Sequence, residues 1–270
     1  MQARFEELVA QIHLKITPRL LISLKVDVPM AIGWLKPVVL LPASMISGLN
    51  NAQLEMLILH ELAHANDFMP PNSFTGLNTQ NTPFEEISSK QASWISTDLN
   101  NISPLNSETM LSLAQVMYTG TEATSTEKDL SAREVGDAFE PDGSAFAYAY
   151  TSQFEDLAML FEMSMMRYFY NVDAEIAFTN AANKCEELFI GWGVINRIGE
   201  NHVNSRAEFI SSKILTEINF DTFFENYSTP ETTSGGWCIP ETSTSSANVK
   251  SNTKRIPKLI PKNDYLRPYL

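Results

Sequence analysis

Apolar positions near the start of the chain change from helical to extended spacing. Four of them recur at helical intervals and predict a helix over residues 3–14: Phe5, Leu8, Val9 and Ile12. The stretch LISLKVDVP (21–29) then alternates, which predicts a half-buried strand whose apolar face carries Ile22, Leu24, Val26 and Val28. Pro29 is expected to end this strand, because proline has no N–H to donate to a sheet.

Short apolar runs separated by proline and glycine follow this strand. AIGW (31–34) and PVVLLP (37–42) predict further strands, so a small sheet is expected in this part of the chain. A helix is predicted next at about 51–68, with Asn50 or Asn51 as its N-cap.

The second half of the chain has mostly helical spacing. Helices are predicted after Ser107 and at 83–99, 152–170, 174–190 and 205–217. The helix at 152–170 is apolar on nearly every side, so we expect it at the centre of the molecule. Residues 69–82 and 119–143 predict loops, and the Ser-, Thr- and Pro-rich residues after Ser228 predict an extended tail.

Together these elements predict an α+β fold with a small N-terminal sheet packed on the helix at 51–68 and a mostly helical C-terminal half. We expect one domain over 1–227, divided into an N-terminal subdomain at 1–70 and a helical subdomain at 83–227. Residues 228–270 are expected to form a tail with a basic end.

The charge of the chain limits the classes of partner. A formal net charge of −13 argues against nucleic acid, because phosphate binding requires surplus Lys and Arg. Residues 250–270 carry six basic groups and one acidic group, so their net charge is +5 and the rest of the chain carries −18. Two interpretations of this basic end stay open: it docks on the acidic body, or it is solvated.

Other bulk features concern the compartment. No apolar run reaches the ~18–20 residues of a membrane-spanning helix, and no signal peptide is visible in the opening MQARFEELVAQ. Cys185 and Cys238 form either one disulfide or two free thiols. The acidic body and the Asn/Ser/Thr-rich loops favour an exported bacterial protein, and the sequence does not predict an oligomeric state.

Two histidines and a glutamate interrupt the otherwise buried pattern of LEMLILHELAHAND. On a helix, His60 and His64 lie one turn apart on the same face, where both imidazoles can reach one metal ion. Glu61 lies on the neighbouring face. This H-E-x-x-H spacing is typical of zinc sites in which the histidines bind the ion and the glutamate takes a proton from water. The alternative, a pair of satisfied core histidines, is uncommon because each would need its own partner.

A third ligand must come from elsewhere, because a catalytic zinc site normally has three protein ligands. The other two histidines, His13 and His202, are interpreted as surface or turn residues. Buried carboxylates on the helix at 152–170 are better candidates. Glu155 also fits a capping box with Ser152, whereas Glu162 lies two turns further on, so one ion cannot bind both glutamates. Asp67 lies on the histidine face, either as a hydrogen-bond partner of a ligand ring or as a polar residue of the helix end.

Two segments resemble known metallopeptidases. HELAHAND and YAYTSQFEDLAMLF resemble the gluzincins, especially the catalytic domains related to anthrax lethal factor. This resemblance implies a zincin-like fold, Glu155 as the third zinc ligand, and Tyr148 as the group that stabilises the tetrahedral intermediate. It also matches Asp67 to the aspartate after the second histidine. A donor near the metal is suited to that role, although Tyr150 is a competing candidate.

The stretch VPMAIGWLKPVVLLPASMISGLNNAQLEMLILHELAH resembles the segment before the zinc helix in BlaR/MecR-type metallopeptidases. The chain departs from both families. It lacks the transmembrane helices and the basic residues after the histidine pair of the BlaR type. Met159 stands where lethal-factor relatives carry a second glutamate, and Glu155 follows His64 by 91 residues.

The expected function is hydrolysis of peptide bonds in a peptide or protein substrate, with Zn²⁺ held by His60, His64 and Glu155. Glu61 is expected to act as general base, and an edge strand between Ala31 and Leu41 to hold the extended substrate. A non-catalytic sensor or binding module on the same fold is the alternative, and a purely structural zinc site is a third hypothesis.

Overall fold

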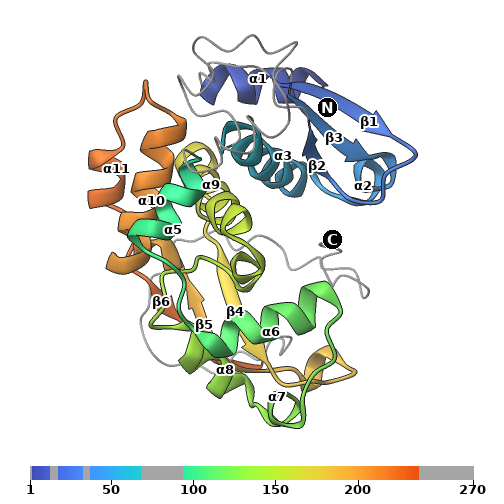
Figure 1. Ribbon diagram of the computed structural model, residues 1–270, viewed down its shortest axis with the longest axis vertical. Coiled ribbons are helices and arrows are strands. Elements are labelled where there is room, and N and C mark those ends of the chain that lie inside the picture. Colours follow the sequence, from blue (N-terminus) through green and yellow to red (C-terminus); the bar gives the residue numbers. More distant parts are fainter. Residues whose placement is uncertain (1, 13–17, 33–36, 68–93, 237–270) are drawn as a thin grey trace, which may run out of the picture.

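The structure, a computed structural model, describes residues 2–12, 18–32, 37–67 and 94–236. These residues form two regions, each with its own sheet, and the long helix α9 (Gln153–Tyr170) lies between them (Figure 1). The predicted α+β class is confirmed. The predicted domain boundaries stay predictions, and the loop expected at 69–82 lies outside the described residues.

The N-terminal region contains helix α1 (Gln2–Ile12) and a three-stranded sheet of β1 (Arg19–Ser23), β2 (Met30–Ile32) and β3 (Val38–Pro42). The strand order is β1-β3-β2, with β1 parallel and β2 antiparallel to β3. The predictions of a first helix and a small sheet are confirmed. The short helix α2 (Ala43–Gly48) was not predicted.

The strand predicted from LISLKVDVP is placed too far along the chain. Strand β1 ends at Ser23, which lies opposite Pro42, the last residue of β3. No β3 residue remains to pair with the chain beyond that point. Leu20 is buried opposite Val39, whereas Ile22 is 56% exposed and Leu24 is 93% exposed. The prediction that Ile22 and Leu24 face the core was therefore wrong.

Helix α3 (Asn51–Asp67) confirms the helix predicted at 51–68. Asn50 is its cap: the Asn50 side chain accepts the Gln53 N–H at 3.0 Å, and the Gln53 side chain accepts the Asn50 N–H at 2.9 Å. The helix packs against β2 and β3 on one side and α9 on the other, as Figure 1 shows. It is therefore covered by protein on two sides, which explains its buried apolar residues.

The C-terminal region confirms several predicted helices. Helix α6 (Glu108–Thr119) follows its cap Ser107, α9 matches 152–170, and α10 (Asn201–Ile214) matches 205–217. Helix α5 (Ile95–Ile102) overlaps the end of the helix predicted at 83–99, whose residues 83–93 lie outside the described residues. The short α11 (Asp221–Glu225) packs on α10.

The helix predicted at 174–190 was wrong. This stretch forms β4 (Glu175–Thr179), the short 3-10 helix η3 (Cys185–Glu187) and the start of β5 (Phe189–Ile195). These strands pair antiparallel, and the short β6 (Glu231–Thr232) and β7 (Gly235–Gly236) add to β5. Tertiary packing explains the difference, because Ile176, Trp192 and Val194 are buried in a second core around Phe139.

Two short helices occupy the stretch 119–143, which was predicted to be loop-rich. Helices α7 (Ser125–Asp129) and α8 (Ala132–Phe139) each begin with a complete capping box, formed by Thr124 with Glu127 and by Ser131 with Glu134. Helix α8 lies directly on β5. A Cβ atom at Gly136 would stand 2.1 Å from the Trp192 Cβ, so only glycine permits this approach.

Two remaining predictions concern the membrane and the cysteines. Among the described residues, no helix has both the length and the apolar character needed to cross a membrane. Cys185 is disulfide-bonded. Cys238 is the only other cysteine of the chain and lies outside the described residues, as do His13 and the basic end.

Candidate metal centre

Helix α3 places its two histidines side by side in the interior. The rings of His60 and His64 stand edge to face, with centroids 4.7 Å apart, and their Nε2 atoms are 3.1 Å apart. Their side chains are only 7% and 12% exposed. The spacing of four residues therefore produces the arrangement predicted from the sequence.

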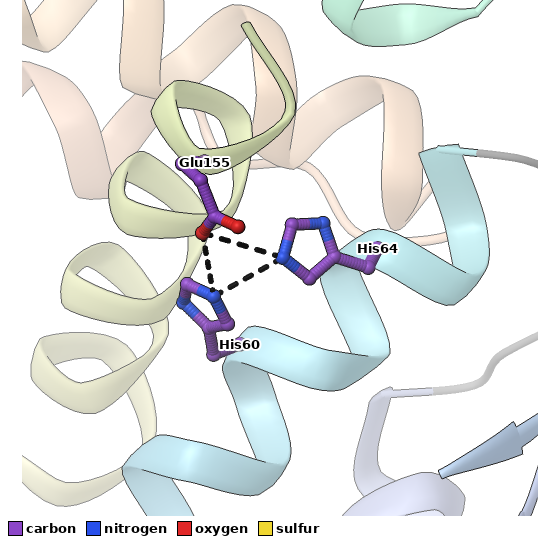
Figure 2. Close-up of side chains that lie close together, drawn as sticks. All are labelled: His60, His64 and Glu155. Carbon is purple, nitrogen blue, oxygen red and sulfur yellow. Dashed lines mark hydrogen bonds and ion pairs between the residues drawn. The ribbon is translucent and has the colours of Figure 1, made fainter. Parts of the chain in front are cut away.

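The third group comes from the first turn of α9. The Ser152 hydroxyl caps this helix by accepting the Glu155 N–H at 3.2 Å, as the capping-box pattern predicted. The Glu155 carboxylate does not complete the box. It points to the two histidines, with its Oε2 atom 3.0 Å from His60 Nε2 and 3.5 Å from His64 Nε2 (Figure 2).

The three atoms suit a tetrahedral metal ion. Their separations are 3.0, 3.1 and 3.5 Å. Ligand atoms bonded at ~2.0–2.1 Å around a tetrahedral ion lie about 3.3 Å from one another. Among the described residues, the group of possible metal ligands holds only these three side chains. The donor set of two imidazoles and one carboxylate is one that zinc accepts.

Glu162 is hydrogen-bonded to the other ring nitrogen of His60. Its Oε2 atom lies 3.0 Å from His60 Nδ1, and its side chain is 2% exposed. A carboxylate accepts hydrogen bonds, so Nδ1 carries a proton, and a neutral His60 ring would present the lone pair of Nε2 to Glu155. Two acceptors facing each other at 3.0 Å require a proton or a cation between them.

The charges around His60 favour a positive charge at this point. Burial lowers the pKa of His60, but the hydrogen bonds to Glu155 and Glu162 outweigh burial and raise it to about 10. Burial likewise raises the pKa of Glu155, while its contacts with His60 and His64 lower that pKa well below its usual range. His60, His64 and Glu155 therefore form a buried group that could hold a cation.

Glu61 lies beside this group. It is 4% exposed, and its Oε2 atom has no hydrogen-bond partner among the described residues. Burial raises the pKa of Glu61, and the nearby charges of His64 and His60 oppose that rise. A buried carboxylate oxygen without a partner favours proton transfer, because it is available to a ligand such as water.

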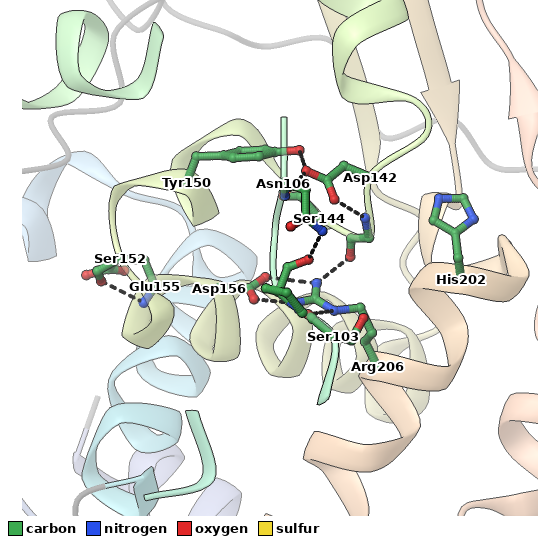
Figure 3. A network of polar contacts seen from close by, with 12 residues as sticks. Ser103, Asn106, Asp142, Ser144, Tyr150, Ser152, Glu155, Asp156, His202 and Arg206 are labelled. Carbon is green, nitrogen blue, oxygen red and sulfur yellow. Dashed lines mark hydrogen bonds and ion pairs between the residues drawn. The ribbon is translucent and has the colours of Figure 1, made fainter. Parts of the chain in front are cut away.

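The structure separates the two tyrosine candidates. Burial raises the pKa of Tyr148, as do the charge of Glu155 and a hydrogen bond to it, and the charge of Glu61 adds to the effect. The Tyr148 hydroxyl therefore lies beside Glu155. The Tyr150 hydroxyl instead donates to Asp142 at 3.1 Å (Figure 3).

Asp67 connects α3 to another helix. Its Oδ1 atom accepts the Ser96 N–H at 2.8 Å, in the first turn of α5. Burial raises the pKa of Asp67, while hydrogen bonds from Ser96 and the charge of His64 lower it. Asp67 is thus near the site, and its predicted contact with a ligand ring stays a prediction. The carboxylate seen on a ligand ring is Glu162.

A buried ion pair fixes the start of α9. The Asp156 carboxylate, next to Glu155 in sequence, pairs with the Arg206 guanidinium of α10, and both residues are at most 4% exposed. Arg206 also donates to the backbone oxygen of Ser103 at 3.2 Å (Figure 3) and to that of Gly143 at 2.6 Å. Burial raises the pKa of Asp156 to about 6 even though Arg206 opposes the rise.

Sequence reasoning missed the role of Glu162 and the pairing of Asp156 with Arg206. The available signal was the placement of three acidic residues on an apolar helix, each of which needs a partner when buried. His202 is 44% exposed and its Nε2 atom lies 3.2 Å from the Glu140 backbone oxygen, consistent with a surface residue.

Comparison with known proteins supports the N-terminal part of this description. A family model described as BlaR1 peptidase M56 matches residues 1–68, about a quarter of the chain, and this segment includes His60, Glu61 and His64. No curated protein and no solved structure matches the chain. The resemblance of residues 146–162 to lethal-factor-like domains stays a prediction. The first 68 residues are therefore similar to a metallopeptidase family, and Glu155 and Glu162 lie beyond the matched segment.

Proposed function

We propose that this chain is a zinc-dependent peptidase that hydrolyses peptide bonds at the group formed by His60, His64 and Glu155. The main support is that three possible ligand atoms, from helices far apart in the sequence, lie within 3.5 Å of one another. The similarity of residues 1–68 to BlaR1 peptidase M56 supports the peptidase class.

In the proposed reaction, each residue around the site has a separate role. When bound, zinc supplies Lewis-acid activation of water and of the scissile carbonyl. Glu61 takes the proton of the attacking water on its carboxylate and returns it to the leaving amine. The Tyr148 hydroxyl, which lies beside Glu155, turns its single O–H from that carboxylate to the oxyanion as the oxyanion forms.

The sheet beside α3 supplies a place for an extended substrate. In the strand order β1-β3-β2, strand β3 is central and β2 (Met30–Ile32) is an edge that packs on α3. Of the predicted substrate edge between Ala31 and Leu41, the described edge strand is therefore β2. Main-chain hydrogen bonds along such an edge recognise peptides independently of their side chains.

The number of ligands favours catalysis over a structural role. Structural zinc sites are closed by four protein ligands, whereas catalytic sites keep one position for water. Only three ligand groups meet among the described residues. A non-catalytic binding module remains the second candidate, and hydrolysis of unstructured casein that a chelator abolishes would decide against it.

The Glu61→Gln variant tests the assigned base. We expect unchanged zinc affinity and a loss of hydrolysis of at least a hundredfold, because the amide cannot accept the proton. Zinc binding is measured by competition with a chelating dye and turnover with a quenched fluorescent peptide. Glu55→Gln, at the other glutamate of α3, is the matched control with a similarly buried side chain. Wild-type turnover in Glu61→Gln would remove Glu61 from this role.

We also propose that the protein is exported. The disulfide at Cys185 supports this proposal, because such bonds persist in oxidising compartments. Thiol labelling of the native protein purified from its own cells, with and without reductant, tests it. Quantitative labelling of Cys185 without reductant would contradict an oxidising location.

A further inference from the structure

A second tyrosine, from the long segment between His64 and Glu155, contacts the ring of Tyr148. The ring of Tyr118, near the end of α6, meets the ring of Tyr148 edge to face, with centroids 4.9 Å apart and planes at 79°. Tyr118 is also among the groups whose proximity raises the pKa of Tyr148. The two rings therefore lie close together, and Tyr148 is the one beside Glu155.

This contact joins two separate cores. Tyr148 packs against the core that contains α3 and α9, whereas Tyr118 packs against the core built around Phe139 and Trp192. Both rings are only half-buried. Tyr148 lies on the short 3-10 helix η2 (Ala147–Thr151), where its backbone oxygen accepts the Thr151 hydroxyl at 2.8 Å. The backbone is fixed in this way, but a half-buried ring needs neighbours to fix its rotamer.

We propose that Tyr118 is a positioning residue that holds the Tyr148 ring so that its hydroxyl stays at Glu155. This inference rests on the proposed function, in which that hydroxyl stabilises the oxyanion. Edge-to-face pairs of aromatic rings have a preferred geometry, so the Tyr118 ring restricts the rotation of its neighbour. The long segment between the metal ligands thereby contributes directly to the site.

A double-mutant cycle separates positioning from general packing. We expect Tyr118→Leu to lower kcat about tenfold with KM and zinc affinity within twofold of wild type, because a displaced hydroxyl no longer meets the oxyanion. In a Tyr148→Phe background, which has no hydroxyl to position, Tyr118→Leu should lower kcat no further. Tyr118→Phe keeps the ring and should retain more than half of the activity. An equal loss in both backgrounds would overturn the proposal.

A measurement on the zinc-free protein keeps this inference distinct from the proposed function. With 3-fluorotyrosine incorporated, the Tyr148 resonance is assigned by its disappearance in Tyr148→Phe. We expect that resonance to move in Tyr118→Leu and to stay in place in Met117→Ala, a control on the exposed side of α6. Should Tyr118→Leu fail to fold, Tyr118→Met provides the same test.

The two proposals then fail in different ways. If the wild type hydrolyses no peptide, the proposed function fails while the fluorine spectra still report whether the Tyr118 ring contacts Tyr148, as positioning requires. If the wild type is active and the Tyr148 resonance does not move in the non-aromatic variants, the positioning role is wrong.

Discussion

At the scale of single residues, the two glutamates of α9 contact the two different nitrogen atoms of the His60 ring. Glu155 faces His60 Nε2, and Glu162 faces Nδ1 of the same ring, each at 3.0 Å. His60 is therefore held from both sides by carboxylates from one helix. When His60 binds a metal ion through Nε2, Glu162 would hold the proton on Nδ1.

We predict that Glu162→Gln weakens zinc binding about 10- to 100-fold, because a neutral amide oxygen makes His60 a poorer ligand than a carboxylate does. Glu162→Met, which removes the acceptor altogether, should weaken binding further. Competition with a chelating dye measures both affinities. Glu175→Gln, at an exposed position on β4, is the control. Equal zinc affinities in the wild type and all three variants would show that Glu162 does not orient His60.

The sequence predicts some of these residues better than others. His60, Glu61 and His64 follow from spacing on one helix, because α-helical geometry alone brings them together. Glu155 was placed by resemblance to a family, since its distance in sequence from His64 says nothing about space. The contact of Glu162 with His60 depends on the rotation of α9 against α3, which no local pattern encodes.

At the scale of elements, the orientation of α9 depends on a buried ion pair next to Glu155. Arg206 of α10 holds Asp156 and two backbone oxygens at once. Loss of one partner leaves the other charge buried without compensation. The pair therefore fixes the helix turn that carries the proposed third ligand.

We predict that Arg206→Met lowers the free energy of unfolding by ~3–5 kcal/mol, and that adding Asp156→Leu restores part of this loss. Urea denaturation of the zinc-free protein measures both. The control is Arg133→Met, because Arg133 and Asp137 form an ion pair with side chains 63% and 50% exposed. In that variant the free energy of unfolding should fall by at most about 1 kcal/mol. A double variant less stable than Arg206→Met would contradict the account.

Local signals account for the predicted elements, and tertiary packing accounts for the errors. Asn50, Ser107 and Ser152 correctly indicated helix starts, because side-chain capping is a local interaction. The capping boxes at Thr124 and Ser131 are local signals of the same kind, but they lie in a polar stretch whose composition predicts loops. Strands β4 and β5 could not be recognised as easily, because their burial depends on α8 and the core around Phe139.

At the scale of the whole molecule, the proposed zinc site connects regions that are distant in sequence. Helix α3 belongs with the N-terminal sheet, while α9 packs with α5 and α10 (Figure 1). The match to the family model includes α3 but ends before α9. A bound ion would therefore stabilise the packing of α3 against α9.

We predict that zinc raises the free energy of unfolding by ~2.7 kcal/mol at a free concentration one hundred times its Kd. A chelator should reverse the effect. Thermal unfolding with buffered zinc measures it, and His202→Gln, at an exposed histidine, should respond like the wild type. An unchanged midpoint over the whole zinc range would exclude a site that joins the two helices.

The most direct measurement is anomalous diffraction at the zinc edge from crystals of the zinc-loaded protein. The account predicts one strong peak bonded to Nε2 of His60, Nε2 of His64 and a carboxylate oxygen of Glu155, with Glu162 on His60 Nδ1. A peak elsewhere, or one at the histidines with Glu155 beyond bonding distance, would contradict it.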